Sequence, residues 1–289
     1  MTRKSWSLFI LVGFLWGIPY LLIRVAVRDF SPAMVVFARV LIGAFILVPL
    51  AIRNKSFRAA LRGYKYIFLY AAVEIMGPWW LITKAETKIS SGLAGLLVAT
   101  VPIWATIYAS VTGDKSVWHH KRMIGLVVGF AGLVAVVGIE SLSGKNALWA
   151  IFSVLVASIG YALAPNMIMR KLPHVSGLAI NALAMTMAAI VYAPFAILQW
   201  PAGHVSTNSL LSVVGLGIFP TAMAFVVFFA VLKDVGPARA SLVTYLNTAF
   251  AVVLGVLILS EKLTLGIVIG LPLVLVGSYL ASRKPVSLS

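Results

Sequence analysis

The 289-residue chain is 62% hydrophobic and 10% charged, with a mean hydropathy of +1.05. A soluble domain is about 45–50% apolar and about 25% charged, so this composition excludes that class and predicts an integral membrane protein. The net charge of +16 does not indicate a nucleic-acid partner, because the basic residues lie in short loops at particular helix ends. The chain has no cysteine and its four histidines fall in predicted loops, so we expect no disulfide, metal site or cofactor, and no enzymatic activity.

Ten stretches along the chain have the character of a spanning helix, which needs about 20 mostly apolar residues. They cover residues 5–27, 32–52, 64–83, 89–111, 122–140, 146–169, 176–198, 208–232, 236–259 and 264–282. The first follows Arg3 and Lys4, as the apolar run of a signal peptide would. It contains Trp16, Pro19 and Arg24 and reaches full spanning length, so we expect a helix there. The expected fold class is an all-α membrane protein whose loops hold no soluble domain.

The Lys and Arg residues of the loops are divided unequally between the two sides of the membrane. With the N-terminus placed in the cytoplasm, 16 of the 23 fall on the cytoplasmic side and 5 on the other. The cytoplasmic group consists of Arg3, Lys4, Arg53, Lys55, Arg58, Arg62, Lys65, Lys115, Lys121, Arg122, Arg170, Lys171, Lys233, Arg239, Arg283 and Lys284. Cytoplasmic loops collect Lys and Arg, so we expect a multi-pass protein of the inner (plasma) membrane with both termini in the cytoplasm.

The two halves of the chain align with each other at an offset of about 145 residues. Residues 53–65 carry five basic side chains, whereas their counterparts at 198–210 carry no formal charge. Pairs that match in this register include Ser31 with Ser176, Pro49 with Pro194 and Gly132 with Gly277. Five helices per half, an odd number, place the second half upside down, and the unequal basic loops agree with this. We therefore predict two inverted five-helix repeats, residues 1–145 and 146–289, an arrangement typical of transporters.

Three features carry a resemblance to a known family. They are Trp16-Gly17 in the first helix, Pro102 in the fourth, and the run Leu259-Ser260-Glu261-Lys262-Leu263-Thr264 before a Gly-rich last helix. Over its entire length the chain resembles the drug/metabolite transporter superfamily in its ten-helix form of two EamA-type halves, and within it the YddG-like exporters of aromatic amino acids. The resemblance implies a secondary transporter that exports its substrate by alternating access. Asn247 stands where the family often has a proline, and Asp114 near Ser116 replaces the Glu261 motif in the first half.

Glu74 is the only acidic residue deep in a predicted span. An unpaired carboxylate there costs about 2.5–3.5 kcal/mol on insertion scales, so we expect it to face a partner or an aqueous cavity. Two interpretations stay open: a hydrogen-bonded or protonated side chain that stabilises helix packing, and a site for a substrate ammonium group or an exchanging proton. Its expected basic partner is Arg39. Arg24, Arg39 and Lys84 lie toward the outer interface, where they either form a gate or rim or extend their charges to the lipid headgroups.

Aromatic residues occur inside several spans and not only at span ends. Rings that face a cavity stack with aromatic or cationic guests, although rings in a span also pack against lipid or neighbouring helices. With Glu74, the candidates for substrate binding are Trp16, Tyr20, Trp79, Trp104, Tyr161, Tyr245 and Asn247. A proline removes a backbone donor and frees a carbonyl one turn earlier, so we expect cavity-lining bends at Pro19, Pro78, Pro102, Pro165 and Pro220.

These residues favour a transporter of small amphipathic solutes, with aromatic and other neutral amino acids as the expected substrates. Proton coupling and downhill flux both remain open. One alternative is an exchanger of phosphorylated solutes or nucleotide sugars, which requires fixed positive charge in the cavity, and this chain has no Lys or Arg near mid-span. Another is an exporter of drugs or cations. Small-residue faces such as Gly125-x-x-x-Gly129 allow close packing within a monomer or a homodimer. The expected partners are a small-molecule substrate and the lipid bilayer.

Overall fold

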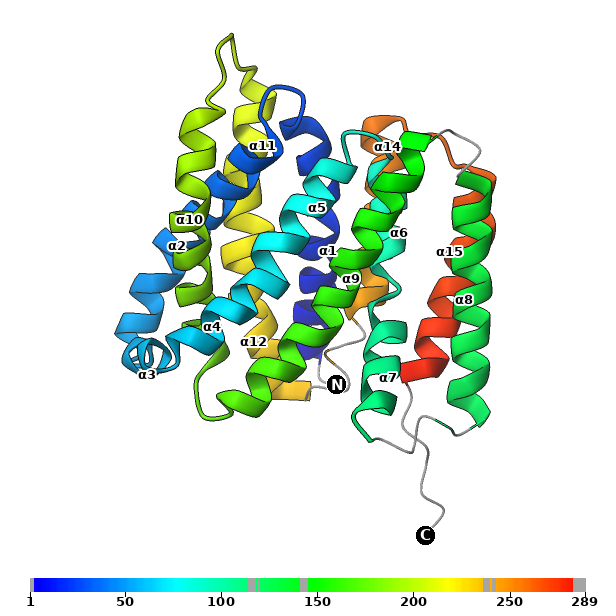
Figure 1. Ribbon diagram of the computed structural model, residues 1–289, viewed down its shortest axis with the longest axis horizontal. Coiled ribbons are helices and arrows are strands. Elements are labelled where there is room, and N and C mark those ends of the chain that lie inside the picture. The colour runs from blue at the N-terminus through cyan, green and yellow to red at the C-terminus, as the bar shows by residue number, and fades with distance from the viewer. Residues whose placement is uncertain are drawn as a thin grey trace.

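The computed structural model describes residues 3–113, 118, 120–140, 145–235, 240 and 243–282, and these residues form helices and no strands (Figure 1). The predicted all-α fold is therefore confirmed for the described part of the chain. In chain order the helices are α1 (Arg3–Ala26), α2 (Pro32–Arg53), α3 (Phe57–Arg62), α4 (Tyr64–Ala71), η1 (Ala72–Met76), α5 (Gly77–Ala85), α6 (Ser91–Val98), α7 (Val101–Val111), α8 (His120–Glu140), α9 (Lys145–Lys171), α10 (Gly177–Leu198), α11 (Thr207–Gly217), η4 (Ile218–Met223), α12 (Ala224–Val235), α14 (Val243–Leu259) and α15 (Leu265–Ser282).

Within the described residues, seven helical stretches are long and apolar enough to cross a membrane. They are Arg3–Ala26, Pro32–Arg53, Tyr64–Ala85, Ser91–Val111, Leu148–Lys171, Gly177–Leu198 and Thr207–Asp234. Three shorter apolar helices, Arg122–Ala135, Val243–Leu259 and Leu265–Leu280, occupy the remaining predicted positions. The first residues of the predicted stretch 236–259 lie outside the described residues, as do Asp114, Lys115, Ser116, Arg239, Arg283 and Lys284.

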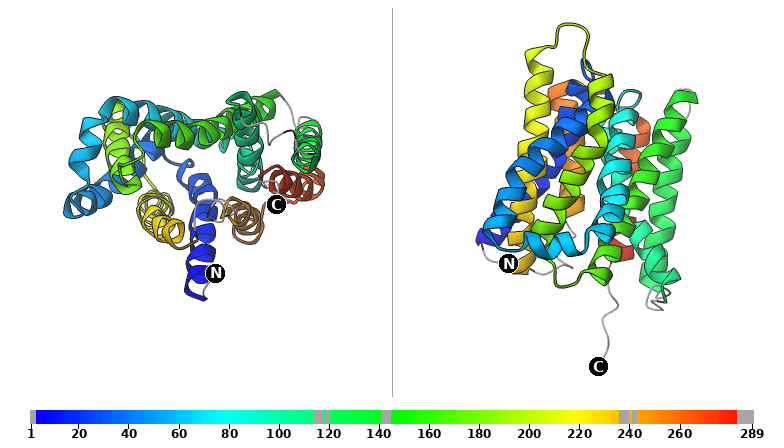
Figure 2. Two further views of the ribbon diagram at one scale, coloured as in Figure 1. Left: turned by 90° about the horizontal axis from the view of Figure 1, so that it is seen from below. Right: turned by 60° about the vertical axis from the view of Figure 1, so that its left-hand side comes forward.

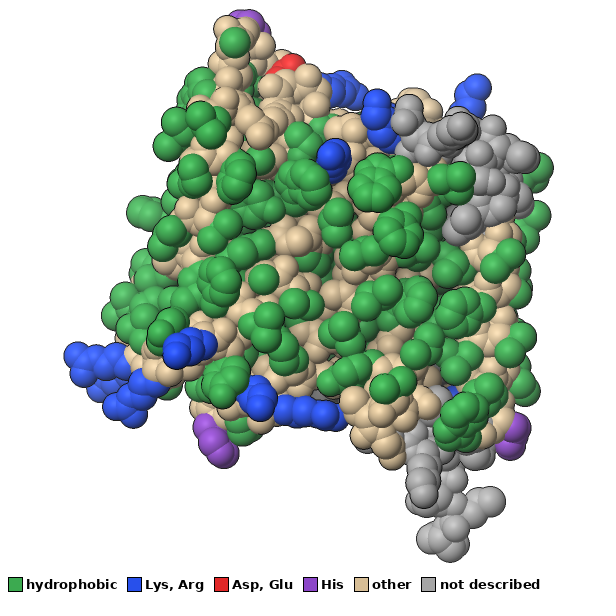
Figure 3. All heavy atoms as spheres, viewed as in Figure 1, with side chains coloured by type: hydrophobic (Ala, Val, Ile, Leu, Met, Phe, Trp, Pro, Cys, Tyr) green, Lys and Arg blue, Asp and Glu red, His purple; other side chains and the backbone are tan. Residues whose placement is uncertain are grey.

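The surface is apolar between its two ends. Large hydrophobic side chains cover the face shown in Figure 3, and Lys and Arg lie near its upper and lower edges. Phe45, Val111 and Leu198 are each more than 80% exposed, at 81%, 82% and 84%. Apolar surface of this extent is rare on a soluble monomer but suits contact with lipid tails. The surface therefore fits a protein embedded in a bilayer.

Seen from below, the helices form two sides of the molecule (Figure 2). Helices α12, α1, α14 and α15 lie along one side, and α4, α5 and α9 lie along the other. Close pairs include α2 with α10, α8 with α15, α1 with α14, and α5 with α9, and each pair joins a helix of the first half to one of the second. The α8–α15 pair is in backbone contact, because a Cβ atom added to Gly277 would collide with the backbone of Gly129.

Several helices are interrupted within their length, and prolines lie at the interruptions. The π-helical turns η1 and η4 interrupt the third and eighth helical stretches, with Pro78 opening α5 directly after η1 and Pro220 within η4. The fourth stretch breaks between α6 and α7, and Pro102 lies in the first turn of α7. Pro19 and Pro165 lie inside the unbroken helices α1 and α9. Three of the five predicted bends thus coincide with an interruption.

The corresponding serines of the two halves begin corresponding helices. Ser31 precedes α2 and Ser176 precedes α10. Each hydroxyl accepts a hydrogen bond from a backbone N–H three residues later, at 3.2 Å from Met34 and at 3.2 Å from Ala179. Such caps satisfy one of the free N–H groups at a helix start and fix where the helix begins.

Candidate functional site

Arg39 of α2 lies in the protein interior, only 7% exposed. Its Cζ atom is 3.6 Å from the centroid of the Trp79 ring of α5, and its Nε donates a 2.8 Å hydrogen bond to Thr221 Oγ1 of η4. Thr221 in turn donates to the carbonyl of Leu216 at 2.7 Å. Cation–π contact and a hydrogen bond therefore hold the guanidinium in place, and it does not extend to the headgroups as one of the two sequence interpretations expected.

Two tyrosines complete the surroundings of Arg39. Tyr20 of α1 is 6% exposed, and Tyr161 of α9 packs against the two larger hydrophobic core clusters. Both tyrosines interact electrostatically with Arg39, and the Trp79 indole N–H interacts with the Tyr161 hydroxyl. We call Tyr20, Arg39, Trp79, Tyr161 and Thr221 the Arg39 cluster. It links α1 and η4 to α5 and α9 across the molecule.

Glu74 lies in η1, and its Oε2 atom is buried without a hydrogen-bond partner. The expected pair with Arg39 is not formed: the Arg39 Nε bonds to Thr221, and the Glu74 Oε2 atom has no hydrogen-bond partner. Around the π-helical turn, Tyr70 donates to Asn181 Oδ1 at 3.2 Å and Tyr192 donates to the Met76 carbonyl at 2.7 Å. Neither bond involves the carboxyl of Glu74, so its Oε2 atom stays without a partner beside the turn.

Helix α9 approaches this π-helical turn at a glycine. A Cβ atom on Gly160 would lie 2.5 Å from the carbonyl oxygen of Val73 and 3.1 Å from Pro78 Cγ. Only a residue without a side chain allows this approach. Tyr161, the next residue of α9, interacts with Trp79.

The end of the molecule at the top of Figure 1, which we call the upper end, holds the loops after α1, α5, α10 and α14. Glu86, directly after α5, is 0% exposed there, and neither of its carboxyl oxygens has a hydrogen-bond partner. Arg24 of α1 donates a hydrogen bond to the backbone carbonyl of Glu86, not to its carboxyl group. Sequence reasoning missed Glu86 because it lies between Lys84 and Lys88, in a segment with the composition of an exposed loop.

Glu261, in the run that carried the family resemblance, caps helix α6. Its Oε1 accepts from Ser91 N at 2.8 Å, and its Oε2 accepts from Ser91 Oγ at 2.9 Å and from Gly92 N at 3.1 Å. A Cβ atom on Gly255 would lie 2.5 Å from the same Oε2. The carboxylate joins the end of α14 to the start of α6, where free N–H groups and the helix dipole favour a negative charge.

Asp29 makes a similar junction at the start of α11. It accepts hydrogen bonds from the backbone N–H of Ser206, at 3.0 Å, and from the Ser206 hydroxyl. These bonds to Ser206, with a further contribution from Ser209, lower the pKa of Asp29 below its usual value. Sequence analysis did not identify Asp29, which has no motif around it.

The other predicted residues lie outside the Arg39 cluster. Trp16 packs on Phe228 with ring centroids 4.7 Å apart. Trp104 donates to Thr100 Oγ1 at 3.1 Å and lies edge-on to Phe130, and Tyr245 lies edge-on to Tyr279. Asn247 is buried and accepts from Thr248 at 3.2 Å, whereas Lys84 is exposed with Nζ 4.6 Å from the Trp80 ring centroid, as a rim residue would be. Of the eight predicted binding residues, the structure brings together Tyr20, Trp79 and Tyr161.

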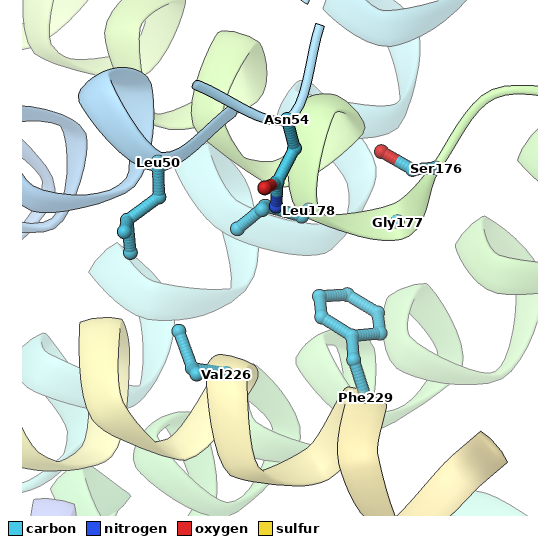
Figure 4. A pocket seen from close by; sticks show the side chains of 7 residues that line it. All are labelled: Leu50, Asn54, Ser176, Gly177, Leu178, Val226 and Phe229. Carbon is cyan, nitrogen blue, oxygen red and sulfur yellow. The ribbon is translucent and has the colours of Figure 1, made fainter. Parts of the chain in front are cut away.

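A pocket of about 380 Å³ lies away from this cluster, toward the lower end of the molecule (Figure 4). It is lined by Leu50, Asn54, Ser176, Gly177, Leu178, Val226 and Phe229, which come from α2, α10 and α12 and the segments next to them. Its lining is mostly apolar and includes none of the predicted site residues.

Comparison with known proteins gives matches over nearly the whole chain. The model of the EamA-like transporter family matches twice, at residues 4–138 and 148–283. The chain is 26% identical over 273 residues to the uncharacterized transporter YoaV of Bacillus subtilis (strain 168), covering 93% of each chain. It is 27% identical over 285 residues to the uncharacterized inner membrane transporter YedA of Escherichia coli (strain K12), covering 94% of this chain and 90% of YedA. A crystal structure of a protein with 16% identity has the same fold, with a TM-score of 0.67 over 97% of this chain and 98% of that one.

Proposed function

This chain belongs to the EamA-like transporter family and is a membrane transporter, and we propose that it exports small amphipathic solutes, chiefly aromatic and other neutral amino acids. Export proceeds by alternating access across the inner membrane. The whole-length similarity to YedA, which is named as an inner membrane transporter, supports that location.

The observation that carries the substrate proposal is the Arg39 cluster. Thr221 engages the Nε atom of Arg39, which leaves the paired terminal nitrogens for a carboxylate. The rings of Tyr20, Trp79 and Tyr161 around it offer apolar faces to an aromatic side chain. Glu74, with a free carboxyl oxygen one turn before Trp79, offers a partner for an ammonium group. An amino acid has these three chemical features.

We also propose that the chain crosses the membrane ten times as two inverted repeats, with the upper end outside. The two matches to one family model, the matching Ser31 and Ser176 caps, and the π-helical turns η1 and η4 in the third and eighth helical stretches support the repeat. The basic residues 53–65 at the opposite end support this orientation. The Arg39 cluster then lies between the halves, where such transporters bind their substrate.

One observation favours a second candidate, transport of phosphorylated solutes. The structure buries the Arg39 guanidinium within the helices, so the protein interior holds a fixed positive charge beside the candidate site. Phosphate groups require such charge, whereas the nearby carboxyl groups of Glu74 and Glu86 disfavour it. The amino acid therefore remains the better candidate.

Uptake into proteoliposomes tests both candidates. Radiolabelled tryptophan, phenylalanine, alanine and a sugar phosphate would each be offered to liposomes that contain the purified protein, with and without a pH gradient. Saturable uptake of the aromatic amino acids above empty liposomes is expected. Uptake of the sugar phosphate alone would replace the first candidate with the second, and uptake of none of them would refute the substrate proposal.

A further inference from the structure

Glu86 is a buried carboxyl group that the proposed transport site does not use. It is 0% exposed, and both of its oxygens lack a hydrogen-bond partner. The charged and titratable groups that face it are Arg24 and Tyr20 from α1, Arg39 from α2, and Glu261 after α14.

None of these neighbours neutralises the Glu86 carboxyl. Arg24 donates to the Glu86 backbone carbonyl, and Arg39 is held by Thr221 and Trp79. Glu261 is a second negative charge, and it already accepts three hydrogen bonds from the start of α6. A carboxylate buried in this way is strongly disfavoured, whereas a neutral carboxylic acid is tolerated.

We propose that Glu86 is a proton-binding site, and that its carboxyl group must be protonated for the upper end of the transporter to close. In this structure the upper end is packed closed, since Glu86 and all eight residues of α6 are buried. Opening this end would admit water to Glu86 and allow it to ionise. The closed state therefore takes up one proton relative to the open state, and the site supplies a route by which a proton gradient biases transport. This inference rests on the proposed alternating access.

The direction of the pH effect follows from the surroundings of Glu86, one residue beyond the span that ends at Ala85. Burial first, and the Glu261 carboxylate second, raise the pKa of Glu86 well above its usual value, and Arg24 and Arg39 lower it to a smaller extent. A hydrated glutamate has a pKa of about 4.3. Between these two pKa values the closed state binds the proton and the open state does not, so the open fraction rises as the pH rises.

Cysteine labelling tests this without any substrate, because the chain contains no cysteine. Thr83 is 1% exposed and lies one turn before Glu86 in α5, so a Thr83→Cys variant reports opening of the upper end to a membrane-impermeant thiol reagent. An exposed position at the same end, Asn208→Cys, gives the intrinsic pH dependence of the reaction. After this correction, labelling at position 83 should rise by up to about tenfold per pH unit above the hydrated pKa.

The matched variants are Glu86→Gln and Glu74→Gln in the Thr83→Cys background. Glutamine imitates the protonated acid, so Glu86→Gln should label slowly and equally at every pH, whereas Glu74→Gln should keep the pH dependence. A pH dependence that persists in Glu86→Gln, that is lost only in Glu74→Gln, or that is absent from the parent would overturn the proposal. Because no substrate is added, failure of the uptake assay would leave this result intact.

Discussion

The three hydrogen bonds that Glu261 accepts from the start of α6 allow a stability prediction with a magnitude. In Glu261→Gln the side chain keeps its length but loses its charge, and its NH₂ group cannot accept from Ser91 or Gly92. At least one of the three bonds, at 2.8, 2.9 and 3.1 Å, is then lost. A hydrogen bond to a charged group contributes about 1.5–3 kcal/mol and the charge at a helix N-terminus about 0.3–1 kcal/mol, so we expect a loss of about 2–4 kcal/mol.

Thermal unfolding of the purified protein in detergent measures this loss. By the scaling of domains of 150–250 residues, the melting temperature should fall by roughly 5–15 °C. Lys262→Gln is the matched control, because Lys262 is the next residue and is exposed, so its replacement should leave the melting temperature nearly unchanged. Equal melting temperatures for wild type and Glu261→Gln, or an equal fall in both variants, would refute the argument that these bonds stabilise the fold.

Three further predictions address the substrate site, an acidic junction and the helix packing. Trp79→Leu should reduce uptake of aromatic amino acids about tenfold or more through a raised KM, since the ring that covers Arg39 is lost. Trp80→Leu, the next residue but outside the Arg39 cluster, should change uptake little. Equal effects of the two substitutions would contradict the proposed site. The pKa of Asp29 is lowered in the folded protein, so its carboxylate stabilises the fold at pH values above the unfolded-state pKa of about 3.9. This stabilisation is lost as the pH falls through the folded-state pKa. Asp29→Asn should therefore lower the melting temperature at neutral pH but not in acid. Gly277→Leu should force α8 and α15 apart and cost about 1–3 kcal/mol in chemical or thermal unfolding, whereas Gly203→Leu, with open space around it, should cost little.

The positions of the helices were accessible from sequence because they depend on local properties. Hydropathy and length place nine of the ten predicted stretches within a few residues of a helix in the structure, and the first residues of the tenth, 236–259, lie outside the described residues. The pair Ser31 and Ser176, matched in sequence only as equivalent positions of the two halves, caps equivalent helices. Prolines indicated the interruptions at η1, η4 and the α6–α7 break, but the same signal at Pro19 and Pro165 marks no break. A proline shows where a backbone donor is missing, and the neighbouring helices decide whether the helix opens there.

The composition of the site was accessible only in part, because it depends on how helices face one another. Tyr20, Trp79 and Tyr161 were identified as aromatic residues within spans; in the structure the Trp79 ring covers Arg39, and Tyr20 and Tyr161 interact with it electrostatically. Thr221 was not identified, since its role comes from η4 lying beside α2, a contact between residues 182 positions apart. The ring of Trp104, equally aromatic and equally within a span, packs on Phe130 instead.

The acidic residues of the upper end bear on why Glu86 is unpartnered. Asp29 and Glu261 lie in loops at this end, and in both cases the fold supplies helix N-terminal N–H groups and serine hydroxyls to the carboxylate. The same end of the molecule therefore provides strong partners for two carboxylates while it leaves a third, more deeply buried, without any. A residue that only filled space there could be apolar at no electrostatic cost. The presence of an acid at this position is explained if its charge changes during the transport cycle, which is the property that the labelling experiment measures.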